Sequence, residues 1–334
     1  GGLFVVSAAD RRRSVKGIPS RQTPLAVWDV VRESLLHRRI FKVNPLLGYM
    51  HMSLAFGWFL LIVVGWIETV AYLGFRYVPL HGHVFFKYFA TELPHKPVFD
   101  FLMDLLLLFV LSGVTLAFGK RIYSQAMGMH RTTRHVLGDR IALSVLWLIF
   151  PARLLAESIT CALHGGGGFL TGTIGEWMAH HVNPIVLQTL YEPLWWAYSI
   201  CLGLFFIVLP FSRYMHIFTE IPLIFLRRYK LHSTEKEGSF DRFQTDACSR
   251  CGICIDPCQL QSELGIDDVQ SVYFLRDRRY NHLRQSVANN CLMCGRCEQR
   301  CPVGIELNTL RLNSRDTMRN TPDEKRYEYF QGVD

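Results

Sequence analysis

Long apolar stretches separated by short polar ones fill the chain from residue 46 to residue 226, and the residues that follow are mostly polar with only short apolar runs. A helix that crosses a bilayer needs roughly 20 mainly apolar residues. Four stretches meet this requirement, at residues 46–75, 98–119, 141–163 and 190–211. The pattern predicts an all-α fold in which a transmembrane helical bundle precedes a helical domain in water.

The composition agrees with a membrane protein. Half of the residues are hydrophobic and only 19% are charged, which excludes a disordered chain and is unusual for a soluble one. A net charge of +8 is compatible with nucleic-acid binding. However, Lys and Arg gather at the ends of the apolar stretches instead of forming one patch, so we expect membrane lipid and no nucleic acid as a partner.

The distribution of Lys and Arg predicts the orientation. Residues 1–45 contain nine of them, the loop at residues 120–140 contains five, and more follow the last span, whereas the other two loops are poorer. Basic loops stay in the cytoplasm, and alternating the four helices places all three rich regions on that side. We therefore expect a multi-pass protein of the inner (cytoplasmic) membrane, with the C-terminal domain in the cytoplasm.

The segment before the first span has two features. An apolar start at residues 1–9 ends in the basic run Arg11–Arg13, which we interpret as the end of a further, truncated span; a short disordered tail is the alternative. Apolar residues then recur at helical spacing opposite basic ones, which predicts an amphipathic helix on the inner membrane surface or against a partner subunit. The apolar residues are Leu25, Trp28, Val31, Leu35 and Leu36, and the basic ones Arg32, Arg38 and Arg39.

Eight of the ten cysteines form two runs in the polar tail, Cys248-x2-Cys251-x2-Cys254-x3-Cys258 and Cys291-x2-Cys294-x2-Cys297-x3-Cys301-Pro302. Thiolates are the ligands of iron–sulfur clusters, and in two-cluster ferredoxins the fourth Cys of each run binds the other cluster. We therefore predict two 4Fe–4S clusters, the first held by Cys248, Cys251, Cys254 and Cys301, the second by Cys291, Cys294, Cys297 and Cys258. Zinc is the alternative, but it needs only four ligands in paired CxxC units. Cys161 and Cys201 lie in apolar spans and are expected to be ordinary buried residues.

The stretch between the two runs, residues 259–290, lacks the alternation of a small β-ferredoxin and is typical of helix. Together with CLMCGRCEQRCPVGIEL at residues 291–307, it resembles the α-helical dicluster ferredoxin module. That module occurs in heterodisulfide reductase subunits and in the iron–sulfur subunits of succinate dehydrogenase-like enzymes.

Two histidines are candidate haem ligands. A haem b in a helical bundle needs two imidazoles from different helices at one depth. His51 lies near the inner end of the first span, and His216 follows the inner end of the fourth, so both belong to the same leaflet. Either histidine alone is more typical of an interfacial residue.

The passage LPFSRYMHIFTEIP at residues 209–222 resembles the end of the last helix in the nitrate reductase gamma-subunit family. The resemblance implies a five-helix cytochrome b, with His216 and His51 as axial haem ligands on the cytoplasmic side. Arg213, three residues before His216, is a candidate for binding a haem propionate. The family's second, distal haem has its ligands where this chain has Leu61 and Tyr198, so we predict a single haem b.

The other histidines are expected to be solvated or interfacial. Those in the outer loops are His81, His83, His95, His164, His180 and His181. For His130 and His135, in the basic inner loop, contact with a quinone or a haem propionate is a weak alternative. Ionisable residues inside spans are functional candidates. Arg153 and Glu157 are one helical turn apart and can neutralise each other, while Asp104 and Glu68 lie towards outer ends that water is expected to reach. A proton-coupled quinone role for Glu157 and Asp104 is the alternative to structural pairing.

These parts predict four segments, at residues 1–45 (end of a truncated span and amphipathic segment), 46–226 (cytochrome b-like domain), 227–246 (linker) and 247–334 (dicluster domain). We expect an electron-transfer subunit of a quinone-linked oxidoreductase, with quinone or menaquinone in the membrane. Its expected partner is a soluble redox subunit of the CCG-domain, flavoprotein or dehydrogenase type. The direction of electron flow stays open.

No GxGxxG or P-loop motif indicates a flavin or nucleotide site, so substrate chemistry is expected elsewhere. Two other functions stay open. One is a haem-free membrane anchor that carries a ferredoxin domain. The other is a subunit of a redox-driven ion pump, which the few charges in the spans disfavour.

Overall fold

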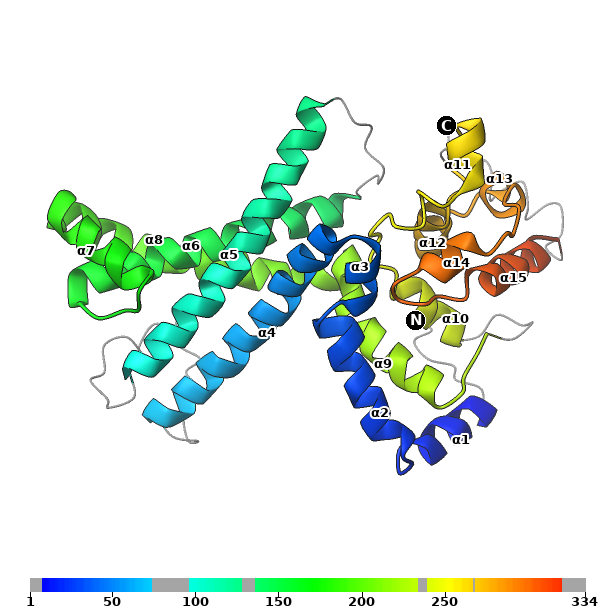
Figure 1. The fold of residues 1–334 in the computed structure, drawn as a ribbon, viewed down its shortest axis with the longest axis horizontal. Helices are drawn as coiled ribbons and strands as arrows, with labels where there is room; N and C mark the ends of the chain where they lie inside the picture. Colours follow the sequence, from blue (N-terminus) through cyan, green and yellow to red (C-terminus); the bar gives the residue numbers. More distant parts are fainter. Residues whose placement is uncertain (1–7, 74–95, 128–135, 234–238, 267, 320–334) are drawn as a thin grey trace. The chain divides into compact units, whose positions relative to one another are not determined.

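The computed structural model describes residues 8–73, 96–127, 136–233, 239–266 and 268–319, and in these ranges all regular structure is helical and no strand occurs (Figure 1). The predicted all-α fold is confirmed. The chain divides into two compact units. One, the membrane unit, comprises Asn44–Met129 and Val136–Ser212; the other, the cluster unit, includes Gly1–Val43 and Arg213–Asp334. Residues 1–7 of the apolar start at residues 1–9, which we interpret as the end of a truncated span, lie outside the described residues.

Within the described part of the membrane unit, four helices are long and apolar enough to cross a membrane. They are α4 (Pro45–Leu73), α5 (Lys96–Ala126), α6 (Leu137–His164) and α8 (Pro184–Val208), the last extended by the 3-10 turn η3 (Leu209–Phe211). Helix α4 packs along α5, and α6 packs along α8 (Figure 1). Large apolar side chains cover the outer faces of these helices, as lipid contact requires; examples are Ile62, Trp66, Leu108, Ile200 and Ile207.

A shorter helix, α7 (Thr171–His181), lies where the sequence predicted only an outer loop, and it packs on α6. His164 is the last residue of α6, and His180 and His181 end α7. The start of α7 is fixed by Asp104 of α5. This carboxylate accepts hydrogen bonds from the backbone N–H groups of Leu170 (2.7 Å) and Thr171 (2.9 Å) and from the Thr171 hydroxyl (2.8 Å).

The expectation that water reaches Asp104 and Glu68 is wrong, because both side chains are buried, at 2% and 3% exposed. A carboxylate that caps a helix needs no solvent to satisfy its oxygens. Gly168 makes this contact sterically feasible, since a Cβ there would lie 2.4 Å from Asp104 Oδ2. The Asp104 carboxylate therefore joins α5 to α7.

The predicted pairing inside the third span is confirmed. Arg153 Nε donates to Glu157 Oε1 at 2.7 Å, and both side chains are buried. Leu61 and Tyr198, which stand where the resembling family carries distal haem ligands, are 2% and 4% exposed and belong to the packed interior of the bundle.

The cluster unit combines the N-terminal helices with the whole C-terminal region. Its N-terminal helices are α1 (Ala8–Gly17), α2 (Gln22–Asp29), the π-helix η1 (Val30–Leu35) and α3 (Arg38–Val43). After the 3-10 turn η4 (Arg213–Met215) come α9 (His216–Arg228), α10 (Ser239–Asp246), α11 (Gln259–Leu264), α12 (Ser271–Arg279), α13 (Gln285–Asn289), α14 (Arg296–Arg300) and α15 (Leu307–Arg319).

Helix α2 packs against α9, and Arg228 Nε donates to Asp29 Oδ2 at 2.5 Å across this contact. Ala26 and Asp29 form the buried side of α2, whereas Leu25 and Trp28 are 45% and 59% exposed. The amphipathic segment is thus helical, and the predicted contact of its apolar side with the membrane surface or a partner stays a prediction.

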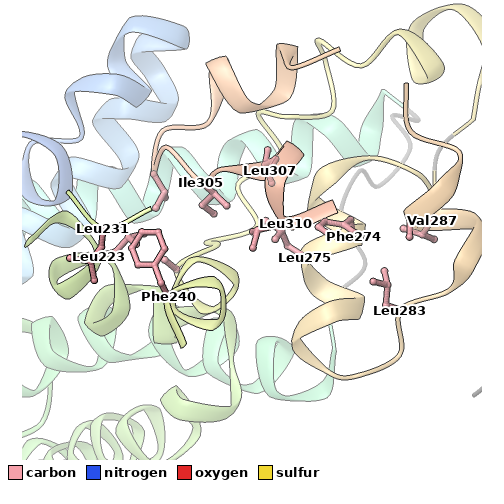
Figure 2. Close-up of a cluster of buried hydrophobic side chains, with 13 residues drawn as sticks. Leu223, Leu231, Phe240, Phe274, Leu275, Leu283, Val287, Ile305, Leu307 and Leu310 are labelled. Atoms are coloured by element: carbon pink, nitrogen blue, oxygen red, sulfur yellow. The ribbon is translucent and has the colours of Figure 1, made fainter. Parts of the chain in front are cut away.

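A large hydrophobic core packs the helices of the cluster unit together (Figure 2). Leu223 of α9 and Phe240 of α10 lie at one end of it, and residues from α12, α13 and α15 continue it. The labelled members from those later elements include Phe274, Leu275, Val287 and Leu310. Because the cysteine loops lie between these helices in sequence, the core positions both loops.

Candidate metal centres

The first cysteine run wraps around a cavity of about 370 Å³, counting its opening to solvent. The chain turns sharply there because Arg250 (φ +54°) and Gly252 (φ +82°) adopt left-handed conformations. The backbone N–H of Ile255 then bonds Gly252 O at 2.9 Å. The thiol-bearing residues on the cavity wall are Cys248, Cys251, Cys254 and Cys301.

The second cavity, of about 430 Å³ by the same measure, is lined by three cysteines of the second run together with residues of the first run and of the helices that follow it. Left-handed residues again produce the turn, here Met293 (φ +56°) and Gly295 (φ +74°). Its cysteines are Cys258, Cys291, Cys294 and Cys297, together with Cys254, which it shares with the first cavity. Each run thus contributes its fourth cysteine to the cavity of the other run.

The two cavities are neighbours. Cys254 and Ser271 line both of them, so their walls touch at these two residues. The Ser271 hydroxyl donates to Cys297 Sγ at 3.1 Å. Groups bound in the two cavities would be separated by little more than these side chains, a short step for an electron.

The arrangement of thiols fits two cages better than single ions. Across the described ranges, no three His, Cys, Asp or Glu side chains are grouped closely enough to hold one metal ion. Zinc requires all four sulfurs about 2.3 Å from one point, whereas a cubane takes one thiolate at each iron corner. Burial raises the pKa of Cys248 to about 12. Binding of a metal therefore has to displace the proton of this thiol.

Arginines of the cluster unit support the first cavity from outside. Arg227, near the C-terminus of α9, donates from its two Nη atoms to the carbonyl oxygens of Val303 and Gly304, two and three residues after Cys301. Arg39 of α3 donates to Pro302 O at 3.3 Å. From the sequence, Arg227 counted only among the basic residues that predict the membrane orientation. Its contact with Val303 could not be predicted, because the two residues are 76 positions apart.

His216 begins α9, and its Nδ1 lies 2.7 Å from Arg213 O. A carbonyl can only accept, so Nδ1 carries the proton and Nε2 keeps its lone pair, which a metal ligand needs. Burial lowers the pKa of His216 to about 4, which keeps the ring neutral. His51 is half-buried in α4 of the membrane unit. Since the two histidines belong to different units, their pairing stays a prediction.

Sequence analysis missed His37, a buried histidine whose electrostatic influence reaches His216. Its Nδ1 lies 3.1 Å from Leu35 O. Arg213 lies near enough to both His216 and Cys251 for its charge to act on each. The start of α9 is therefore electrostatically connected to the first cavity.

The remaining candidates are simpler. His81, His83, His95, His130 and His135 lie outside the described residues. His180 and His181 are exposed, as expected for the outer side. Cys161 is buried, and Cys201 is half-buried.

Comparison with known proteins finds one matching family model. Residues 244–305 match the family model of the 4Fe-4S dicluster domain. The match is just under a fifth of the chain and includes both cysteine runs. No curated protein and no solved structure gives a significant match to the chain. The chain therefore contains a 4Fe–4S dicluster domain, which implies electron transfer, alongside four helices of membrane-spanning length.

Proposed function

We propose that this chain is the electron-transfer subunit of a quinone-linked, heterodisulfide reductase-like respiratory complex. Electrons pass between a quinone or menaquinone in the membrane and a soluble redox subunit, through one haem b and two 4Fe–4S clusters. The observation that carries the proposal is the grouping of eight cysteine thiols around two adjoining cavities, in a chain that also has four helices of membrane-spanning length.

The cysteine sets follow the cavity walls. Cys248, Cys251, Cys254 and Cys301 hold the first cluster, and Cys258, Cys291, Cys294 and Cys297 hold the second. The clusters supply one-electron carriers when bound. The protein holds them in series next to the core that includes Phe274 and Leu310, and adjusts their potentials through nearby charges and hydrogen bonds.

His51 and His216 are the proposed axial ligands of the haem, and Arg213 is the proposed propionate partner. Two observations support His216 in this role, namely its neutral ring and the orientation of its Nδ1 towards Arg213 O. The packed positions of Leu61 and Tyr198 support a single haem. Because Arg213 acts on both His216 and Cys251, we propose the order haem, first cluster, second cluster, soluble partner.

The proposal is tested on the complex purified in detergent, by a pyridine haemochrome assay and by iron and acid-labile sulfide analysis. We expect one haem b and about eight cluster irons per chain. His216→Ala and His51→Ala should each abolish the α-band of the haem while sulfide stays unchanged. His181→Ala is the matched control, because His181 also bonds a backbone carbonyl, Trp177 O at 2.8 Å, but is exposed.

An α-band that survives both axial substitutions contradicts the haem assignment. Full sulfide with no haem in the unaltered chain would instead support the haem-free anchor.

A further inference from the structure

The second cavity contains a cation on its wall. Arg311, in α15, lines that cavity and is only 1% exposed. An arginine this deeply buried is uncommon, because removing a guanidinium from water costs more than most single contacts return. Some charge or dipole in its surroundings must therefore compensate for it.

The contacts of the Arg311 side chain are all to neutral groups. Nη1 donates to Val287 O, and Nη2 donates to Val269 O at 2.6 Å. The guanidinium carbon lies 4.4 Å from the centre of the Phe274 ring. No carboxylate forms an ion pair with Arg311 in the part of the chain that the structure describes. The carbonyl dipoles and the ring face orient the guanidinium, but they do not neutralise its positive charge.

Three cysteines of the same cavity act electrostatically on Arg311. Cys258, Cys291 and Cys297 all interact electrostatically with Arg311, and each favours its charged form. Four thiolates carry more negative charge than an iron–sulfide cage neutralises, so a bound cluster is anionic, and reduction adds one further negative charge. The cavity therefore offers the missing counter-charge only when it holds a cluster.

We infer that Arg311 is the buried counter-cation of the 4Fe–4S cluster held by Cys258, Cys291, Cys294 and Cys297, and that it raises the reduction potential of that cluster. The inference rests on the iron–sulfur part of the proposed function and not on the haem or the quinone. A fixed positive charge in a poorly solvated site stabilises the reduced cluster more than the oxidised one, because the reduced form carries the extra negative charge.

A second consequence concerns assembly. In the chain without the cluster, the cavity holds no bound anion that would offset the buried charge of Arg311. Binding of the cluster and burial of Arg311 are therefore coupled, as metal binding and folding are coupled in other small metal-binding domains.

Arg315 provides a matched control on the same helix. It lies one turn further along α15 and also donates to backbone carbonyls, those of Ala288 at 2.9 Å and Cys291 at 2.8 Å. It is half-buried, however, so water screens its charge. The two arginines share helix, chemistry and neighbourhood, and differ in exposure.

The test is an EPR-monitored redox titration of the complex in detergent, with dithionite as the electron donor. The signal of the second cluster is identified as the one that Cys258→Ser removes. In Arg311→Gln we expect the equilibrium constant for reducing that cluster to fall about tenfold, which is about 59 mV for one electron. Arg311→Lys should keep most of the potential, and Arg315→Gln and the first cluster should change little.

An unchanged potential in Arg311→Gln, or an equal shift in Arg315→Gln, overturns the inference. Should Arg311→Gln fail to assemble the second cluster, Arg311→Lys decides: a cluster retained near its original potential supports the charge role, and loss of the cluster in both variants overturns it. Because dithionite bypasses the haem and the quinone, failure of the membrane part of the proposed function leaves this result interpretable.

Discussion

Cys258 and Cys301 each line the cavity of the other cysteine run. Cys258 ends the first run but lines the second cavity, and Cys301 ends the second run but lines the first. This arrangement links the two loops, so neither cavity is complete without a residue from both. It also makes each proposed cluster depend on one identifiable residue that lies far away in the sequence.

Substituting these two residues should therefore affect the clusters in a crossed manner. Cys301→Ser is expected to remove the EPR signal of the cluster held by Cys248, Cys251 and Cys254, and Cys258→Ser that of the other cluster. Each variant should lose up to half of its acid-labile sulfide. The control is Cys201→Ala, which changes a half-buried membrane cysteine and should leave the sulfide unchanged. The assignment is wrong if each substitution removes the signal of its own run.

Helix α7 should depend on Asp104. Asp104→Asn replaces a charged acceptor that receives three hydrogen bonds with an amide that can accept at only one atom. We expect a loss of about 1–3 kcal/mol in the free energy of unfolding, seen as a lower melting temperature in detergent and faster proteolysis between α6 and α8. Glu176→Gln, at an exposed position on α7, should change neither. If the Asp104→Asn variant and the unaltered chain have the same melting temperature, the Asp104 carboxylate does not stabilise α7.

Glu220 should make the stability depend on pH. Burial raises the pKa of Glu220 from 4.5 to about 7, although Arg227 and Arg39 oppose the shift. Between these two pKa values the folded state binds a proton that the unfolded state does not, so the free energy of unfolding falls as pH rises from about 4.5 to about 7. The effect is on the order of 1–3 kcal/mol.

Thermal unfolding in detergent at pH 5 and at pH 8 measures this effect. Glu220→Gln should flatten the difference between the two melting temperatures, and Glu263→Gln, at an exposed position on α11, should not. A Glu220→Gln variant that keeps the full pH dependence would show that another group titrates.

Arg227 should stabilise the first cluster through the loop after Cys301. In Arg227→Gln the carbonyl oxygens of Val303 and Gly304 lose their guanidinium donor. Gly304 is in a left-handed conformation, at φ +71°, and a Cβ there would lie 2.9 Å from Arg227 Nη1, which shows how closely the two pack. We expect several-fold faster loss of the first cluster in air, followed by absorbance. Arg228→Gln, which breaks the contact with Asp29 instead, should bleach at the original rate.

The parts of the structure that depend on local pattern could be predicted from the sequence. Apolar runs predicted the four long helices, and the spacing of cysteines predicted iron–sulfur ligation. Some helix ends were misjudged although a local signal was present. Helix α8 begins six residues before the predicted start of its span, because Asn183 accepts a hydrogen bond from Ile185 N at 2.9 Å and Pro184 follows it.

The features that sequence analysis missed depend on contacts between distant residues. The start of α7 is fixed by Asp104, 66 residues before Leu170. Arg311 has the appearance of a solvated residue in a charged tail, and only the packing of α15 against the second cavity buries it. His37 was missed because its electrostatic influence on His216 depends on the fold, which buries His37.

We propose that electrons move in series between a quinone, the haem and the two clusters. The most direct measurement is anaerobic stopped-flow mixing of the purified complex with a menaquinol analogue, recording the α-band of haem b and the bleaching of the clusters. We expect the haem to be reduced first and the clusters afterwards, with both phases lost in His216→Ala and only the cluster phase slowed in Cys301→Ser. Clusters that bleach at the original rate in His216→Ala would contradict this proposal.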